Sequence, residues 1–436
     1  RLFVYSSIRL FVYSSIRPTT HREHKMIIRD PVHGDMSFNE SERRVMDTRQ
    51  MQRLRGVRQT GSAYLVYPGC VHTRFEHSLG TTAMSRCVLD VLRRGGAQIE
   101  SEQADAVALA ALVHDISHLP FGHTFEDERK LFPRHDTAAR MKHFLTQTEI
   151  AQALDASGLR DTVISLLTDK SFSPAWMQQI VSSTIDADLL DYLRRDAYFA
   201  GLRQDYDDRI FSTFMLADEN LAIDVTRLST RTELLHLLRL RYFLTERVYY
   251  HHAKVSSGAM IAKAVEIATE HGLAETDLYT LTDDALFRHL LSYQDPRIDR
   301  LINGVCERRL LKRAYMISTA EVGRRGRDEL IATYNRSVES RQQIERQIAD
   351  AVTINPDQVI LYCPDISAIK EARVRVVTQN GLSRLNDPPD NPPFDVKVVE
   401  DQYERLWKFY IFAPEGYRER VGKVCERVFG ESNALV

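Results

Sequence analysis

The most constraining feature of the sequence is an unbroken apolar run that ends in a histidine and an aspartate. Residues 107–113 read VALAALV, and His114 and Asp115 follow directly. A helix that is apolar on every side is a buried helix, and an imidazole beside a carboxylate at its end is costly unless something pairs with the two groups. His118 lies one helical turn beyond His114 on the same face, and Pro120 ends the helix. The stretch therefore predicts a buried helix with polar groups at its carboxyl end.

Two interpretations of this polar end are open on the residues alone. Together with His123, the segment holds three histidines and an aspartate within ten residues, which favours a metal site. A buried, hydrogen-bonded His–Asp pair followed by surface histidines is the other interpretation of this segment. Two other stretches favour the metal: His77 precedes another apolar-periodic segment, and residues 185–196 (IDADLLDYLRRD) contain four carboxylates.

The composition is that of an ordinary globular protein. Hydrophobic residues make up 43% and charged residues 27% of the 436, and the net charge of −2 argues neither for nor against nucleic acid. The five cysteines are scattered, with no spacing typical of a zinc knuckle or a disulfide framework, which favours a cytoplasmic location. No apolar run reaches the ~18 residues of a membrane span, so no membrane partner is expected.

The first 25 residues differ in character from the rest of the chain. The octapeptide RLFVYSSI occurs at 1–8 and again at 9–16, and a perfect duplication of this length has no packing logic. We expect residues 1–25 to be a non-native or leader segment. A translated upstream stretch is favoured over a targeting signal, with Met26 as the natural start.

Hydrophobic periodicity predicts a mainly α fold, with an all-helical core and a small C-terminal α+β appendage. Residues 27–38 suit a short hairpin, and in the body only residues 221–226 are typical of a strand. The pattern changes near Arg313, and we expect one domain at 26–312 and an α+β region at 313–436. The predicted helices are 39–58, 75–94, 101–117, 135–144, 149–154, 161–167, 174–182, 187–199, 234–269, 329–350 and 418–429; the predicted C-terminal strands are 358–363, 372–378 and 407–412, with a Pro-rich loop at 386–393.

A donor set of imidazoles and carboxylates has a definite chemistry. Such a mixed nitrogen and oxygen site favours a first-row transition metal or zinc over calcium. Four protein ligands on an octahedral ion leave positions for a water and a phosphate oxygen, and the ion neutralises charge on the phosphate. Three further histidines are then available to position the nucleophile, to protonate the leaving oxygen or to help hold a second ion: His118, His123 and His135.

Longer motifs make a family resemblance specific. A histidine, a His–Asp pair and a later aspartate spread along a chain are the signature of the HD phosphohydrolases, and here the pattern reads His77, His114, Asp115 and Asp188. The chain resembles the HD-domain deoxynucleoside triphosphate triphosphohydrolases, which include the metazoan SAM-and-HD-domain enzyme and bacterial relatives. The matching stretches occur in family order between residues 27 and about 252: MDTRQMQRLRGVRQTG, YPGCVHTRFEHSLG, LVHDISHLPFGHTFE, RHDTAARM, IDADLLDYLRRDAYFAG and LRYFLTERVYYHH.

The resemblance implies hydrolysis of dNTPs to deoxynucleosides and triphosphate, with site residues that carry over by position. The implied metal ligands, for a divalent ion such as Mg, Mn, Fe, Zn or Ni, are His77, His114, Asp115 and Asp188. The implied catalytic group is His135, with His118 and His123 along the phosphates and Arg74 gripping the substrate. The implied substrate contacts are Gln59 at the sugar, Tyr192 and Asp196 at sugar and base, Arg241 at a phosphate and Tyr249 near the base. Without the resemblance, Arg74 reads as a surface arginine, Tyr192 as a core residue and Asp196 as a salt-bridge partner.

The sequence departs from the animal members at three positions near the substrate. Thr60 replaces a leucine that packs under the sugar, Leu189 replaces a phosphate-binding lysine, and His252 replaces another lysine. A triphosphate carries about four negative charges, so the loss of cations near it weakens binding. These changes affect the expected substrate and product and leave the phosphohydrolase class untouched.

One further match concerns regulation. Asp47, Gln52 and Arg55 stand where the animal enzyme reads a guanine nucleotide at an activator site between subunits, and this set suits the donors and acceptors of a guanine edge. A solvated helix face explains the same residues. By resemblance, a homo-dimer or homo-tetramer with a nucleotide activator is implied.

Two other functional classes stay open. The chain is an HD phosphohydrolase for another nucleotide or a phosphate monoester, or it is a non-catalytic scaffold that senses nucleotides or binds nucleic acid. The last reading uses the basic stretch VGRRGR at residues 322–327, which is too short to establish nucleic-acid binding.

Overall fold

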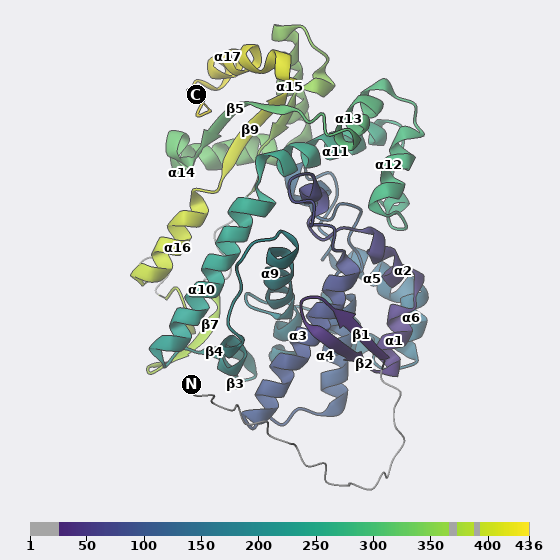
Figure 1. Ribbon diagram of the computed structural model, residues 1–436, viewed down its shortest axis with the longest axis vertical. Coiled ribbons are helices and arrows are strands. Elements are labelled where there is room, and N and C mark those ends of the chain that lie inside the picture. Colours follow the sequence, from purple (N-terminus) through teal and green to yellow (C-terminus); the bar gives the residue numbers. More distant parts are fainter. Residues whose placement is uncertain (1–25, 366–372, 388–392, 436) are drawn as a thin grey trace, which may run out of the picture.

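Helices form most of the architecture, which confirms the prediction of a mainly α fold with a small C-terminal α+β appendage (Figure 1). The computed structural model describes residues 26–365, 373–387 and 393–435. The prediction about residues 1–25 and most of the predicted loop at 386–393 lie outside the described residues. The division of the chain at residue 312 stays a prediction.

Three helices form the centre of the body. Helix α3 (Arg74–Arg94) packs against both α4 (Ser101–Val113) and α9 (Ala187–Phe199). In α4 every residue from Ala106 to Val113 is buried, as the apolar run predicts. The helix ends at Val113, so the histidine and aspartate that follow lie in the turn after a core helix.

Shorter helices surround this centre. The predicted helix at 39–58 is divided in two, because the Thr48 hydroxyl accepts a hydrogen bond from the Met51 amide and so caps a new helix. The surrounding helices are α1 (Glu40–Met46), α2 (Arg49–Arg53), α5 (Ala138–Gln147), α6 (Glu149–Asp155), α7 (Arg160–Thr168), α8 (Ala175–Val181), α10 (Leu228–Leu244), α11 (His252–Glu270), α12 (Asp283–Leu291) and α13 (Pro296–Cys306). A single helical turn, η3 (Thr124–Glu128), follows the turn after α4.

In the described part of the chain, the strands form three small sheets. The predicted hairpin is β1 (Met26–Asp30) paired antiparallel with β2 (Gly34–Phe38), with Met26 opposite Phe38. A second sheet has the order β3-β4-β7-β8, and a third the order β5-β9-β6. Their strands are β3 (Phe214–Ala217), β4 (Asn220–Asp224), β7 (Arg375–Thr378), β8 (Gly381–Arg384), β5 (Lys312–Ser318), β9 (Lys408–Ala413) and β6 (Ile360–Tyr362).

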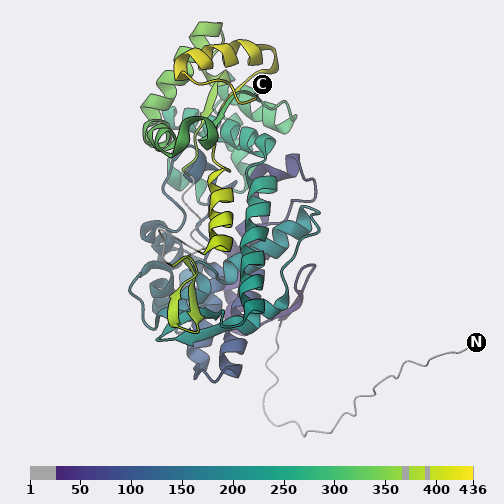
Figure 2. The ribbon, with the colours of Figure 1, turned by 90° about the vertical axis from the view of Figure 1, so that its left-hand side faces the viewer.

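Parts of the C-terminal region return to the helical body. Strand β7 pairs in parallel with β4, and α16 (Phe394–Glu404) lies along α10, as both ribbon views show (Figures 1 and 2). The rest packs around the sheet β5-β9-β6: α14 (Thr319–Leu330), α15 (Val338–Val352) and α17 (Arg418–Phe429). Within the described residues, no helix combines the length and the apolar character that crossing a membrane requires.

Candidate active site

The carboxyl end of α4 meets α3 and α9 in a cluster of imidazoles and carboxylates. Ligand atoms of His77, His114 and Asp115 all lie within 4.8 Å of one another. Asp188 Oδ1 lies 2.9 Å from His77 Nε2 and 3.8 Å from His114 Nε2. Ligand atoms that share one ion at about 2.0–2.2 Å are roughly 3 Å apart. The structure thus brings the four predicted metal ligands together from α3, α9 and the turn after α4.

Hydrogen bonds fix both imidazoles in a tautomer that suits metal binding. His77 Nδ1 lies 2.7 Å from the Asp191 carboxylate, and His114 Nδ1 lies 2.7 Å from the Ala111 carbonyl oxygen. In the neutral form of each ring, Nδ1 therefore carries the proton and Nε2 has the lone pair that an ion would bind. Within the described part of the chain, both Nε2 atoms are buried without a hydrogen bond. Two orphaned lone pairs beside two carboxylates fit a divalent ion.

The charges of the cluster also favour a bound cation. Burial disfavours the imidazolium form of His77, yet Asp188 and Asp191 raise the pKa of His77 to about 10. Burial likewise opposes ionisation of Asp188, but the neighbouring His114 and His77 rings hold its pKa below the usual range. The cluster thus attracts positive charge. Asp188 is its most open member, with 38% of the side chain exposed, so the cluster opens on the Asp188 side.

Arg74 lies behind the cluster. Its Nη1 donates to Asp115 Oδ2 at 2.5 Å, and the side chain is buried. The close packing depends on Gly122, which has φ +59° and at which a Cβ would lie 2.6 Å from Arg74 Nη2. The structure thus makes Arg74 a partner of a candidate metal ligand, and its predicted contact with substrate stays a prediction.

Asp191 is a supporting residue that the sequence interpretation did not name. It accepts hydrogen bonds from His77, from His33 Nε2 at 2.6 Å and from Arg195, and Arg195 also binds Asp30. Asp191 lies three residues after Asp188 on α9, and this spacing was the available signal. The network holds the His77 ring in place from the side opposite the ligand atom.

We expect Asp191→Asn to weaken metal binding about 10–100-fold, because the amide no longer enforces the proton on His77 Nδ1. A chelator-competition titration measures the dissociation constant. Asp30→Asn is the matched control, since it removes the other carboxylate on Arg195 without touching His77. Equal metal affinity in the two variants would show that Asp191 does not orient the ligand.

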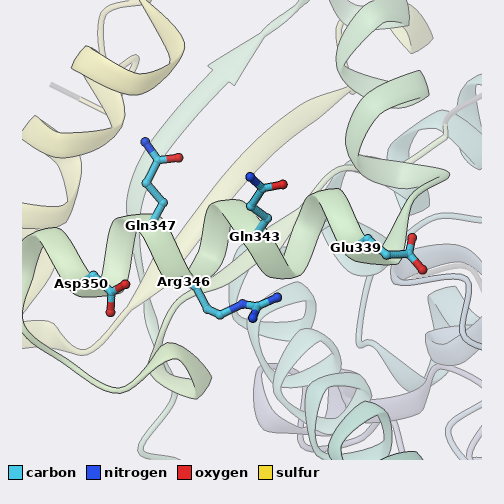
Figure 3. A pocket seen from close by; sticks show the side chains of 5 residues that line it. All are labelled: Glu339, Gln343, Arg346, Gln347 and Asp350. Carbon is cyan, nitrogen blue, oxygen red and sulfur yellow. The ribbon is translucent and has the colours of Figure 1, made fainter.

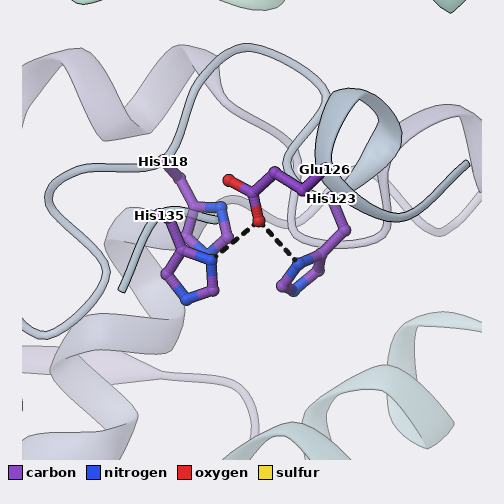
Figure 4. Close-up of side chains that lie close together, drawn as sticks. All are labelled: His118, His123, Glu126 and His135. Atoms are coloured by element: carbon purple, nitrogen blue, oxygen red, sulfur yellow. Dashed lines mark hydrogen bonds and ion pairs between the residues drawn. The ribbon is translucent and has the colours of Figure 1, made fainter. Parts of the chain in front are cut away.

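A second cluster adjoins the first (Figure 4). Its members are His118, His123, Glu126 and His135. Glu126 Oε2 lies 3.0 Å from His135 Nδ1 and 3.4 Å from His123 Nδ1, and Arg140 donates to Glu126 Oε1 at 3.1 Å. Glu126 was not named from the sequence, although it lies three residues after His123. The buried carboxylate organises the two histidines.

The arrangement of the rings favours proton transfer over a second ion. His118 and His135 are stacked, with ring centroids 3.6 Å apart and planes 21° apart, so their in-plane lone pairs run side by side instead of converging. Burial lowers the pKa of His135, although Glu126 opposes the shift. Burial and the Arg74 charge hold the pKa of His118 well below its usual range. With Nδ1–H donated to Glu126, His135 has Nε2 available to exchange a proton.

The predicted substrate residues of α9 are hydrogen-bonded to residues of α10 and of the segment after it. Tyr192 lies one turn beyond Asp188, and its hydroxyl accepts a hydrogen bond from Arg241 Nε at 2.9 Å. Tyr249 donates to Asp196 at 2.6 Å. His72, which the sequence interpretation missed, lies 2.6 Å from the other Asp196 oxygen. The structure thus links Tyr192 to Arg241 and Asp196 to Tyr249. The Gln59 backbone amide donates to the His72 carbonyl oxygen.

The predicted activator residues lie outside both clusters. Gln52 accepts a hydrogen bond from Arg55 Nε at 2.8 Å, and the Arg55 guanidinium lies 3.7 Å from the centre of the Phe75 ring. Asp47 is paired with Arg43 at 2.9 Å. Gln52 and Arg55 are therefore hydrogen-bonded to each other on an exposed surface of α2 and the turn after it.

Three further features place limits on function. Leu189 belongs to the apolar core, so it offers no charge to a phosphate. The stretch 322–327 is part of α14, and its three arginines are each paired with a carboxylate, which weakens a nucleic-acid role: Arg324 with Glu404, Arg325 with Glu329 and Arg327 with Asp328. A hollow on α15 is lined by acidic, basic and amide groups, none of them from either cluster (Figure 3): Glu339, Gln343, Arg346, Gln347 and Asp350.

Comparisons with known proteins match this arrangement. The HD domain matches residues 74–196 and the HD associated region residues 205–434. The chain is 28% identical over 425 residues to an uncharacterized protein of Methanocaldococcus jannaschii, covering 92% of this chain and 84% of that protein. It is 26% identical over 465 residues to the deoxynucleoside triphosphate triphosphohydrolase SAMHD1 of Homo sapiens, covering 94% and 71%. A phosphohydrolase structure from Bacteroides thetaiotaomicron shares the fold, with a TM-score of 0.70 at 21% identity over 89% of this chain and 100% of that one.

Proposed function

Because the chain belongs to the HD-domain family that carries the HD-associated region, we propose that it hydrolyses deoxynucleoside triphosphates to deoxynucleosides and inorganic triphosphate. The family supports a metal-dependent phosphohydrolase, and the human relative's name gives the substrate class. One observation carries the proposal: His118 Nε2 lies 3.2 Å from Asp115 Oδ1. A metal-ligand set and a proton-transfer set therefore adjoin in one site.

The metal would be held by His77, His114, Asp115 and Asp188. The donor set favours a first-row transition ion or zinc, while Mg remains compatible with the two carboxylates. When bound, the ion polarises the phosphate and activates water. A second ion that arrives with the substrate is also proposed. The stacked rings of the second cluster do not favour an ion between those histidines.

The reaction adds water across the bond between the α-phosphorus and the 5′-oxygen. The water oxygen bonds to phosphorus, the bond to the 5′-oxygen breaks, and the leaving oxygen takes a proton. We assign that proton exchange to Nε2 of His135, which Glu126 orients through Nδ1. His123 has 46% of its side chain exposed and would meet the phosphates from the open side, while His118 would line them from its buried position between His123 and His135.

Sugar selection would rest on Tyr192 and Gln59. Tyr192 is fixed by Arg241 one turn beyond Asp188, so its ring would leave no room for a 2′-hydroxyl, while Gln59 would bind the 3′-hydroxyl. A clash or an unpaired buried group discriminates by several kcal/mol.

We expect dNTPs to be hydrolysed at least ~10-fold faster than the matching NTPs. Rates are measured by chromatography for each dNTP and NTP pair with Mn²⁺ present. Equal rates on ATP and dATP, or stepwise loss of single phosphates, would instead support the second candidate, a phosphohydrolase for another nucleotide or a phosphate monoester. Leu189 favours this candidate because it is apolar and brings no positive charge to a triphosphate.

We also propose that a nucleotide activates an oligomer of this chain, a dimer or tetramer, through Asp47, Gln52 and Arg55. Arg55→Ala should lose nucleotide activation and keep its metal, because the arginine contacts Gln52 and the Phe75 ring, neither of which is a candidate ligand. A ligand that binds only the assembled state favours assembly by mass action. Activity is measured against nucleotide and enzyme concentration. Arg44→Ala, a nearby exposed arginine on α1, is the control, and full activity of a dilute, nucleotide-free monomer would refute the activation.

A further inference from the structure

A cluster of buried charges joins the HD-associated region to the loop that carries the second histidine cluster. Its five members come from three separate parts of the chain: Arg129 after η3, Lys263 and Glu266 on α11, and Arg341 and Glu345 on α15. All five side chains are buried. We call this set the Arg129 cluster.

Arg129 is the centre of this cluster. Its Nε donates to Glu266 Oε2 at 2.8 Å, and its Nη1 donates to Glu345 Oε1 at 2.8 Å. Its backbone carbonyl oxygen accepts a hydrogen bond from Arg341 Nη2 at 2.7 Å. Both the side chain and the backbone of one loop residue are thus held by α11 and α15.

The carboxylates are themselves fixed. Lys263 Nζ donates to Glu266 at 3.1 Å and to Glu345 at 2.8 Å, and the Leu361 amide donates to Glu345 Oε1 at 2.9 Å. Gln342 donates to Glu266 Oε1 at 3.1 Å. Every bond therefore restricts where Arg129 can lie.

The position of Arg129 in the chain gives this fixation a consequence. Only two residues separate Arg129 from Glu126, which binds His135 and contacts His123. The loop closes locally, since the Leu131 amide donates to the Phe125 carbonyl oxygen at 2.8 Å. A shift at Arg129 would therefore move Glu126.

We propose that the HD-associated region positions the catalytic loop through the Arg129 cluster, with Glu266 and Glu345 as positioning residues. The inference rests on the proposed function for the role of that loop. Buried ion pairs are weak sources of stability, because desolvation offsets their attraction. Their strict geometry instead restricts the loop to one arrangement, which a reaction that depends on alignment within about 1 Å requires.

The test compares two carboxylate-to-amide variants of the full chain. Glu345→Gln removes a charge from the Arg129 cluster, whereas Asp357→Asn removes a buried partner of Arg300 in the same region, without contact with the loop. Hydrogen exchange measured by mass spectrometry reports opening of residues 124–132. Metal content, kcat and KM are measured on the same samples.

We expect Glu345→Gln to speed amide exchange at residues 124–132 about tenfold and to lower kcat about tenfold with KM and bound metal unchanged. Asp357→Asn should match the wild type in all four measurements. Unchanged loop exchange in Glu345→Gln, or an equal rise in Asp357→Asn, would overturn the proposal. If Glu345→Gln fails to fold, Gln342→Ala removes one bond to Glu266 and should give a smaller rise confined to the same amides. Faster exchange without dNTP hydrolysis by the wild type would refute the proposed function and retain the positioning.

Discussion

Asp115→Asn is expected to lose bound metal and to lower dNTP hydrolysis at least ~10³-fold while the fold survives. Asp115 is the carboxylate at which His77, His114 and His118 meet, with its oxygens 3.2–3.6 Å from their Nε2 atoms. An amide is a far weaker ligand than a carboxylate of the same shape. Metal content by mass spectrometry, turnover and thermal melting are measured on one preparation.

Asparagine is the informative replacement because Asp115 also binds buried Arg74. Alanine would leave that guanidinium without its partner and would destabilise the protein for a separate reason. The amide oxygen can still accept from Arg74. The control is Asp186→Asn: Asp186 is also buried, but it caps α9, with its Oδ1 accepting from the Leu189 amide. The oxygen of asparagine keeps that cap and loses only the bond from the Ser183 amide to Oδ2. Full metal occupancy in Asp115→Asn would contradict the assignment.

His135→Gln is expected to keep the metal and to lower turnover at least ~10²-fold. The ring is oriented by Glu126 and is stacked on His118, so Nε2 is the atom that exchanges a proton. Glutamine retains a donor toward Glu126 but cannot exchange a proton near neutral pH. Single-turnover rates separate this chemical step from product release.

The matched control is His143→Gln. His143 lies on α5 against Phe144 and Tyr279, apart from both clusters, and its replacement should leave turnover unchanged. Near-normal turnover in His135→Gln would remove the assignment, and the role would then pass to His118 or His123.

The sequence predicted the core helix and its polar end because both are local features. The apolar run of α4 has no polar face, so burial follows from the letters alone. The bounds of α9 were likewise predicted at 187–199, since Asp186 caps that helix through the Leu189 amide. Candidate metal ligands were recognisable because their spacing is a family pattern.

What was missed depends on contacts between distant segments. Asp191 and His33 are 158 residues apart, and His72 and Asp196 are 124 apart, so no local pattern reveals either pair. Glu126 acquires its role only when the loop brings it against His135. Without the family resemblance, Arg74 reads as a surface arginine, yet the fold buries it against Asp115.

The missed strands and helices have a similar cause. Strand β5 is stabilised by antiparallel pairing with β9, about a hundred residues later. Strand β8 is short and mostly exposed and forms only as a hairpin with β7. The stretch 322–327 contains two glycines. The Ser318 capping box starts a helix before it, and Gly323, with φ +66°, kinks that helix.

The identity of the released phosphate tests the central claim most directly. Metal-stripped wild-type enzyme is supplied with increasing equivalents of Mn²⁺ and one dNTP. After the metal is chelated, the phosphate products are measured by phosphorus-31 NMR and the deoxynucleoside by chromatography. The account predicts that inorganic triphosphate and deoxynucleoside appear in equal amounts and only as metal is restored. Orthophosphate or pyrophosphate as the first product, or hydrolysis by the stripped enzyme at the restored rate, would contradict it.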